Sequence, residues 1–139
     1  MSTYLLAWVV SKYESATNMS ARGVKFEAFY SDASLVQRAA DVGAKMLDHF
    51  EQKVFGIKYK LPKIDIVAVE KFSGAAMENW GMMTFNNKFV LHSPDWKSSD
   101  IYYCIILHRK KYPRMIQKTF KNGTYKYQLS RYHSRTNKL

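Results

Sequence analysis

Cysteine is nearly absent from this chain of 139 residues. Cys104 is the only one, which excludes an internal disulfide and any metal site built from several cysteine thiolates. Two Asn-x-Ser/Thr triplets, at Asn18 and Asn122, permit glycosylation if the chain is secreted, but such triplets often arise by chance. The scarcity of cysteine therefore leaves the compartment open.

Long hydrophobic runs are absent as well. No run approaches the roughly 18 apolar residues of a membrane span. The apolar stretch at residues 4–10 is short, has no Lys or Arg before it and lacks an A-x-A-like cleavage site. It therefore predicts a buried β-strand rather than a targeting signal. The hydrophobic content of 47% and aromatic content of 15% nevertheless exclude a disordered chain, and the length suits about one domain.

Acidic residues are scarce in the C-terminal third. Residues 1–96 contain 11 Lys and Arg and 10 Asp and Glu, a net charge of +1 (11 − 10). Residues 97–139 contain the other 11 basic residues and a single acid, Asp100, a net charge of +10 (11 − 1). This change after Trp96 predicts a boundary between a nearly neutral body and a basic, irregular tail.

The basic tail has two possible explanations. Its lack of a periodic apolar face favours an altered reading frame, a retained intron or a splice variant as the source of residues 97–139. The alternative is a selected basic arm that binds RNA, DNA or anionic lipid through its charge. We favour the first explanation, so nucleic acid is not the partner that the sequence indicates most strongly.

The body contains strand and helix patterns. Residues 24–30 alternate roughly at period two and predict a half-buried strand, whereas the polar residues 12–21 predict a loop. Asp32 offers an N-cap for a helix that extends to about Val54. One apolar stripe is expected to form the buried face of this helix: Leu35, Ala39, Val42, Met46, Phe50 and Val54.

The β-branched residues 64–70 predict a further strand. Two interpretations of residues 82–92 are open. In one, strands at residues 82–85 and 88–92 pair as a hairpin through Asn86 and Asn87, which tolerate positive φ. In the other, a single strand is followed by an irregular crossing.

The stretch FSGAAMENWG, residues 72–81, resembles the exopeptidase signature of the M1 family of zinc aminopeptidases, in which Gly-Ala-Met-Glu-Asn is followed by Trp-Gly. The resemblance covers about residues 1–96. MSTYLLAWVV is similar to the strand that ends the family's N-terminal β-domain, and FGIKYKLPKIDIVAVEKF is similar to the segment that leads to the signature.

The resemblance implies an α+β fold in three parts. Residues 1–22 would be the end of an N-terminal β-domain and a linker, and residues 23–96 the first helix and sheet strands of a thermolysin-like peptidase domain. That domain would be incomplete, as in a truncated member of the family, and residues 97–139 would be a divergent basic tail.

The resemblance also implies a substrate-binding role for the signature. Glu78 would pair with the free α-ammonium group of a peptide through a charge-assisted hydrogen bond. The peptide would lie along an edge-strand backbone, braced from behind by two further residues. The backbone residues would be Ala75, Ala76 and Met77, and the bracing residues Asn79 and Trp80. The competing interpretation of Glu78 is an exposed loop carboxylate without a partner.

One position departs from the family pattern. This chain has Ala75 where the family has glycine, and Gly74 lies one place earlier. If the family glycine requires a positive φ or a close backbone approach, alanine is disfavoured there. The departure affects the shape of the groove more than the role of Glu78.

The zinc-binding motif of the family, H-E-x-x-H, is absent from these residues. In that motif two His on one helix face hold the metal, and the Glu is the general base. The four His residues lie at positions 49, 92, 108 and 133, and no two are four residues apart. Around His108, Arg109 would stand in the base position and Tyr112 in the position of the second ligand, so His108 is better explained as a solvated residue of the tail.

The expected function is that of a fragment of a zinc-dependent M1 aminopeptidase, a family that hydrolyses N-terminal residues from peptides. Zinc belongs to the intact family, and we expect none to be bound by this chain, which is then inactive alone. The expected partners are peptide N-termini, a full-length aminopeptidase or a second copy. The alternatives are a non-catalytic binding module and a basic-tail binder of nucleic acid or anionic surfaces. Intact relatives are often extracellular or at the plasma membrane and sometimes cytoplasmic, so the compartment stays open.

Overall fold

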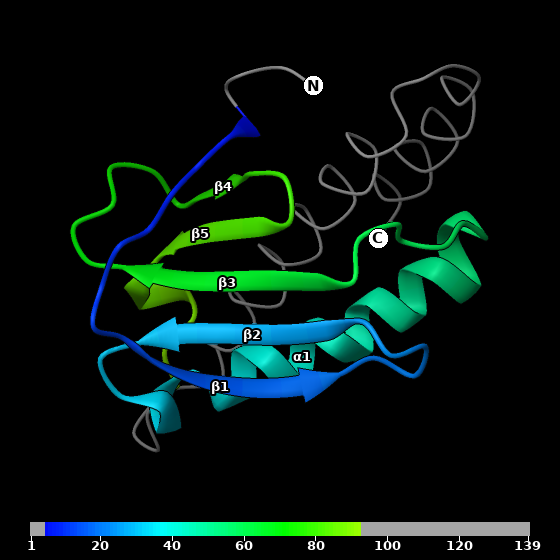
Figure 1. Ribbon diagram of the computed structural model, residues 1–139, viewed down its shortest axis with the longest axis horizontal. Coiled ribbons are helices and arrows are strands. Elements are labelled where there is room, and N and C mark those ends of the chain that lie inside the picture. Colours follow the sequence, from blue (N-terminus) through cyan, green and yellow to red (C-terminus); the bar gives the residue numbers. More distant parts are fainter. Residues whose placement is uncertain (1–4, 93–139) are drawn as a thin grey trace, which may run out of the picture.

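The computed structural model describes residues 5–92, which form one five-stranded β-sheet with a helix, α1, against one face (Figure 1). The strands are β1 (Glu14–Met19), β2 (Lys25–Tyr30), β3 (Lys63–Val69), β4 (Ala76–Glu78) and β5 (Met82–Asn86), and α1 spans Gln37–His49. The predicted mixture of helix and sheet is confirmed in this part of the chain. Within it, no helix has the length and apolar character needed to cross a membrane.

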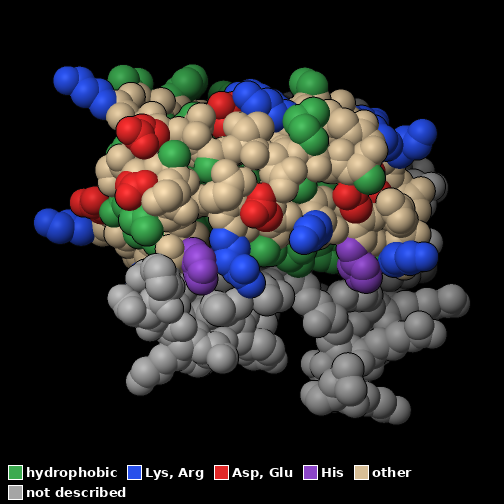
Figure 2. Space-filling model, turned by 90° about the horizontal axis from the view of Figure 1, so that it is seen from below, with side chains coloured by type: hydrophobic (Ala, Val, Ile, Leu, Met, Phe, Trp, Pro, Cys, Tyr) green, Lys and Arg blue, Asp and Glu red, His purple; other side chains and the backbone are tan. Residues whose placement is uncertain are grey.

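The described residues contain only one of the two boundaries of the predicted three-part division. The boundary after Trp96 and the basic tail lie outside the described residues. The division between residues 22 and 23 stays a prediction, although β1 and β2, on either side of it, pair in the same sheet. On the face seen in Figure 2, Lys and Arg side chains are interspersed with Asp and Glu side chains, in keeping with the small net charge of the body.

The sheet has the strand order β1-β2-β3-β5-β4. β2, β3 and β5 are parallel, whereas β1 and β4 are antiparallel to their neighbours and lie at the two edges. Parallel neighbours need a long crossover connection, and α1 supplies it between β2 and β3. β4 and β5 are antiparallel, so the short connection of residues 79–81 is enough to join them.

The core lies between α1 and the inward face of the sheet, where the strands are in register. Phe26 lies opposite Ile64, Ile66 opposite Met83, and Ala68 opposite Phe85. All six of these residues have an exposed fraction of 0%. The strands predicted at residues 24–30 and 64–70 are thereby confirmed, and apolar burial is the main force that holds them against α1.

The predicted helix is present in three pieces. The Asp32 carboxylate accepts a hydrogen bond from the Ser34 N–H at 2.8 Å and caps a 3₁₀ turn, Ala33–Leu35. α1 follows, and a π-helical turn, Phe50–Phe55, ends at Gly56 with a φ of 63°. Glycine adopts this left-handed conformation without the steric cost of a side chain, so the helix ends there.

The buried face of α1 is only partly the predicted stripe. It consists of Ala39, Ala40, Gly43, Ala44 and Leu47. Val42 and Met46, which belong to the predicted stripe, are half-buried at its margin. Four of the five buried residues are small, which lets the helix backbone approach the sheet closely. Of the larger side chains of the expected stripe, Val42 and Met46 lie beside this contact, whereas Phe50, just after α1, is 1% exposed and part of the core as predicted.

Two predictions near the N-terminus are wrong. Of the stretch predicted as a buried strand, residues 6–10 have no regular secondary structure, and Trp8 and Val10 are 83% and 100% exposed. The stretch predicted as a loop contains β1, in which only Ala16 is buried. A tight turn with Gly23 at φ 85° leads β1 back along β2, so the polar strand takes the place beside β2.

The hairpin predicted between residues 82–85 and 88–92 is also wrong, and the alternative is confirmed. β5 is followed by a 3₁₀ turn, Asn87–Phe89, and not by a second strand. The antiparallel partner of β5 is β4, which precedes it in the chain. The hairpin in this region is therefore formed by the signature residues themselves.

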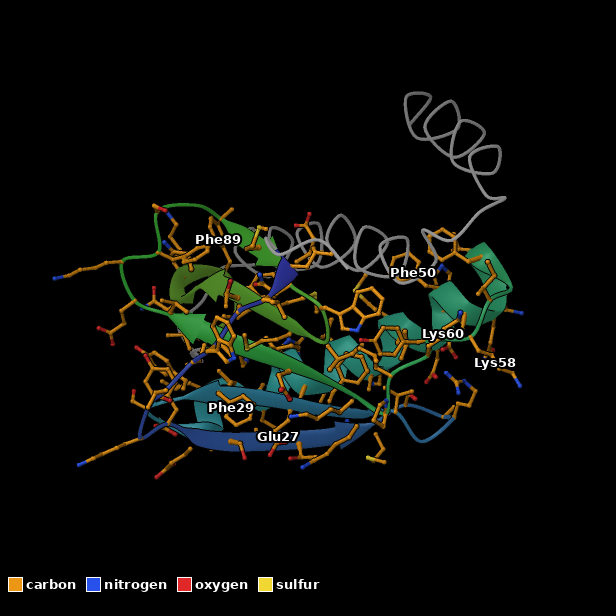
Figure 3. All side chains as sticks on the ribbon, turned by 45° about the horizontal axis from the view of Figure 1, so that its top comes forward. Glu27, Phe29, Phe50, Lys58, Lys60 and Phe89 are labelled. Atoms are coloured by element: carbon orange, nitrogen blue, oxygen red, sulfur yellow. The ribbon has the colours of Figure 1, made fainter. Side chains whose placement is uncertain are left out.

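A partly buried ion pair ties the β1–β2 turn to the π-helical turn after α1 and to the segment that leads to β3. Arg22 donates to both carboxylate oxygens of Glu51, at 2.9 and 2.6 Å, and to the Tyr59 carbonyl at 2.9 Å. The Tyr59 N–H donates to the same carboxylate. Burial acts to raise the pKa of Glu51, but these hydrogen bonds outweigh it and hold the pKa below its ordinary value. Figure 3 shows Phe50 at the end of α1, with Lys58 and Lys60 on the segment that leads back to β3.

Replacing Glu51 by glutamine should destabilise the fold. We expect Glu51→Gln to lower the free energy of unfolding by about 2 kcal/mol at neutral pH, because two ionic hydrogen bonds from Arg22 are weakened. Since the folded pKa of Glu51 is lowered, its contribution is complete above the unfolded pKa and is lost as pH falls through the folded pKa. Urea unfolding should therefore show a difference between wild type and variant that shrinks in acid.

Glu27→Gln is the matched control. Glu27 pairs at 2.9 Å with Lys25, whose side chain is 42% exposed, so its loss should cost less than about 1 kcal/mol. Equal destabilisation by the two substitutions would contradict the structural importance of the Glu51 pair.

Candidate functional site

The signature residues form the outer edge of the sheet. β4 contains Ala76, Met77 and Glu78, and it is the last strand in the sheet order (Figure 1). Ala75 precedes the strand and is exposed, whereas Asn79 follows it and is 5% exposed. All five predicted site residues are therefore consecutive at one edge. Ala76 and Met77 lie in the strand as expected, whereas Ala75 precedes it and Glu78 is its last residue. Their role in binding is not tested by this placement.

The backbone of β4 alternates between the sheet and its open edge. The Asn86 N–H donates to the Ala75 carbonyl at 3.0 Å, and Met77 lies opposite Thr84. In an antiparallel ladder every second residue directs both backbone groups at the partner strand. Ala75 and Met77 therefore face β5, and the N–H and C=O of Ala76 point away from β5. Glu78 has the same orientation as Ala76 by this alternation.

The Glu78 side chain lies on the inward face of the sheet. Glu78 is opposite Met83, which is opposite Ile66, so the three side chains share one face. Glu78 is only 8% exposed. The interpretation of Glu78 as an exposed loop carboxylate is therefore wrong. A carboxylate in this position interacts with a bound cation more strongly than one in water, because the surrounding dielectric is lower.

The turn after Glu78 is held by its backbone. The Trp80 N–H donates to the Leu5 carbonyl at 3.0 Å, and the Gly81 carbonyl accepts from the Asp65 N–H at 2.9 Å. Gly81 has a φ of 77°, and a Cβ there would meet the Leu61 side chain at 3.2 Å. Glycine is required at this position for both reasons. The bracing role of Asn79 and Trp80 stays a prediction.

Asn86 fastens the loop that leads into β4, a role that the sequence did not indicate. Its side-chain amide donates to the Phe72 carbonyl at 2.9 Å, and its N–H donates to the Ala75 carbonyl. The loop of residues 72–75 is thus tied to the end of β5. Asn86 was expected only as a turn residue, and the contact joins positions 14 residues apart in the chain, beyond the range of local sequence patterns.

Ala75 shows none of the backbone strain expected of a misplaced alanine. Among the described residues, the only non-glycine residue with positive φ is Lys71, at 52°. Ala75 is also exposed. Alanine is therefore compatible with the backbone of this chain at the position where the family has glycine.

A zinc site is not formed by residues 5–92. This part of the chain has no group of three or more His, Cys, Asp or Glu side chains that could hold a metal ion. His108, with Arg109 and Tyr112, lies outside the described residues. The donors described here do not fit a catalytic zinc ion, which needs three protein ligands and an open position.

Comparison with known proteins gives consistent matches. The model of the peptidase family M1 domain matches residues 38–107. Glutamyl aminopeptidase from Bos taurus is 36% identical over 101 residues, which are 71% of this chain and 10% of that protein. Aminopeptidase 2, mitochondrial, from Saccharomyces cerevisiae is 46% identical over 86 residues, 61% of this chain and 9% of that protein.

Endoplasmic reticulum aminopeptidase 2 from Bos taurus is 38% identical over 101 residues, 71% of this chain and 10% of that protein. The chain thus spans about a tenth of the length of these relatives. The matched residues 38–107 include α1 from Arg38 onward, β3, the signature strand β4 and β5. With half of its residues matched by the family model and the signature at the sheet edge, the chain belongs to the peptidase M1 family.

Proposed function

We propose that this chain is the part of an M1 zinc aminopeptidase that binds the N-terminus of a peptide, with Glu78 as the acceptor of the free α-ammonium group. The observation that supports this most directly is a carboxylate, 8% exposed, at the end of the edge strand of the described sheet in a member of this family. The resemblance of residues 72–81 to the exopeptidase signature agrees with the same role.

The chemistry of Glu78 favours an amine with a free charge. An ionised carboxylate and an ammonium group form a short, charge-assisted hydrogen bond, about twice as strong as a neutral one. A peptide with an acetylated N-terminus has no such charge and would not form this hydrogen bond. Glu78 would therefore distinguish free from blocked N-termini.

The backbone of β4 can orient the rest of the peptide. The outward N–H and C=O of Ala76 would form hydrogen bonds with an extended peptide, which then becomes an additional strand. Such bonds depend on the peptide backbone and not on its side chains. They would position the peptide without selecting its sequence, while Glu78 fixes where its N-terminus lies.

Hydrolysis needs more than this binding site. In intact members of the family a zinc ion supplies the activated water, and residues 5–92 offer no group of donors for it. We therefore propose that the 139-residue chain binds peptide N-termini and does not cleave them by itself. Its association with a full-length aminopeptidase would follow if the site were completed by another chain.

Peptide binding should depend on the free amine and on Glu78. We expect a labelled peptide with a free N-terminus to bind at least about tenfold more tightly than its acetylated form in fluorescence anisotropy. Glu78→Gln should abolish this difference because the amide has no charge. Glu70→Gln, at an exposed glutamate after β3, is the control and should preserve it. Equal binding of the two peptides by the wild type would contradict the proposal.

Ala76→Pro tests the edge strand separately. Because the Ala76 N–H points away from β5, proline removes a donor to the peptide and leaves the β4–β5 ladder intact. We expect about tenfold weaker binding of the free peptide with an unchanged thermal transition. Met77→Pro should instead lower the melting temperature, since the Met77 N–H faces β5. Unchanged peptide binding by a folded Ala76→Pro variant would exclude strand addition at β4.

The isolated chain should have no peptidase activity. We expect no release of an aminoacyl reporter and no stoichiometric zinc by metal analysis of the purified chain. Turnover that is removed both by a chelator and by Glu78→Ala would refute this expectation. Turnover that survives Glu78→Ala would indicate a contaminating peptidase.

A further inference from the structure

The loop between β3 and β4 has to cross the end of β5. In the sheet order β5 lies between these two strands, and its last residue, Asn86, is in register with Val69 at the end of β3. The loop leaves β3 after Val69 and enters β4 at Ala76, so residues 70–75 pass the carboxyl end of β5 (Figure 1). Asn86 therefore lies where the loop crosses.

Asn86 binds the loop at two points. Its side-chain amide donates to the Phe72 carbonyl at 2.9 Å, and its backbone N–H donates to the Ala75 carbonyl at 3.0 Å. The backbone bond continues the β4–β5 ladder by one residue, whereas the side-chain bond reaches beyond the ladder. The side-chain bond is thus a contact that a substitution can remove without changing the backbone pairing of the sheet.

The loop contains a strained residue next to this contact. Lys71 has a φ of 52°, a left-handed conformation that is disfavoured for a residue with a Cβ atom. Ser73, Gly74 and Ala75, which follow Phe72, are exposed. A residue stays in a disfavoured conformation only where its surroundings impose it. The bond from Asn86 to the Phe72 carbonyl is placed to do so, because Phe72 is the next residue after Lys71.

We propose that the Asn86 side chain is a positioning residue for peptide binding, an inference that rests on the proposed function. By holding the Phe72 carbonyl it fixes the path of the chain into β4 and keeps the outward N–H and C=O of Ala76 in place for a peptide strand. Strand addition is weaker when the accepting strand has to be ordered on binding. A peptide at the outer edge lies on the other side of β4 from β5, so Asn86 acts through β4.

Asn86 and Glu78 differ in what they contribute to binding. Glu78 acts on the charge of the peptide amine, whereas Asn86 acts on a backbone that pairs with the peptide whether or not its N-terminus is blocked. Loss of the Asn86 amide should therefore weaken free and acetylated peptides by the same factor. Loss of the Glu78 charge should instead remove the difference between the two peptides.

Asn86→Asp tests the contact in the full 139-residue chain. The substitution is nearly isosteric, removes the donor to the Phe72 carbonyl and retains an oxygen that accepts from the Lys88 N–H. In fluorescence anisotropy we expect the Kd of the free and of the acetylated peptide to rise about five- to tenfold, with their ratio unchanged. Asn86→Ala removes the same donor without adding charge and should weaken both peptides similarly.

Asn87→Asp is the matched control. Asn87 is the neighbouring residue, and its side chain accepts from the Lys88 N–H at 2.8 Å, a bond that aspartate keeps. The variant has the same added charge as Asn86→Asp but leaves the Phe72 contact intact, so peptide binding should be unchanged. Equal weakening by the two aspartate variants would assign the effect to charge and overturn the proposal.

Amide hydrogen exchange separates local positioning from a loss of overall stability. In Asn86→Asp the Met77 N–H, which faces β5, should exchange at least about fivefold faster, because β4 opens more often. The amides of β3, which is held by the core, should exchange at wild-type rates. Equal acceleration in β3 and β4 would mean that the substitution only destabilises the fold, and it would contradict a positioning role.

The outcomes distinguish this inference from the proposed function. If the wild type prefers the free peptide and both Asn86 variants bind the two peptides as tightly as the wild type, the positioning role is excluded and peptide binding stands. If the Asn86 variants lose only the preference for the free peptide, Asn86 belongs to amine recognition and the inference is wrong. A wild-type chain that binds neither peptide would overturn the proposed function and this inference with it.

Discussion

The pairing of β5 with two different strands is the contact on which the candidate site depends. On one side β5 joins β3, whose inward side chains are buried against α1. On the other side it holds β4, which has only three residues and no other strand beside it in the described part of the chain. A strand this short is not stable alone, so the position of Glu78 follows from the packing of Met83 and Phe85 on β5. The site is therefore an extension of the core and not a loop placed on its surface.

This dependence explains why both ends of the signature are fastened by backbone hydrogen bonds. Asn86 holds the entering loop, and the Gly81 carbonyl is bound by the Asp65 N–H on β3. In the role proposed for Glu78, a carboxylate that is held in advance gains affinity for an incoming amine, because ordering it on binding would cost conformational entropy. The partly buried ion pair between Arg22 and Glu51 also fixes backbone near the start of β2, because it ties the β1–β2 turn to the π-helical turn after α1.

The sequence predicted those features that depend on neighbours in the chain. The strands at residues 24–30 and 64–70, the cap at Asp32 and the end of the helix near Val54 follow from local patterns, and the structure confirms them. The predictions for residues 6–10 and for β1 were the reverse of what the structure shows. Apolar content measures the tendency of a segment to be buried, but it does not show whether a partner strand is present. The buried face of α1 was predicted only in part, because small residues, which carry little hydrophobic signal, make most of the contact. Glu78 was singled out by its motif. The role of Asn86 was missed, because its side chain contacts Phe72, a residue distant in the chain.

Two parts of this chain offer a backbone to a partner strand, and they differ in what gives specificity. At β4 the outward groups of Ala76 lie beside a buried carboxylate, so a partner gains most when it carries a positive charge at the end of an extended backbone. Residues 6–10 have no charge, so no single contact there selects a partner. Any apolar strand could pair with them, so their composition selects no ligand. At β4 the side chain beside the strand makes the difference, because the Glu78 carboxylate favours a ligand with a positive charge.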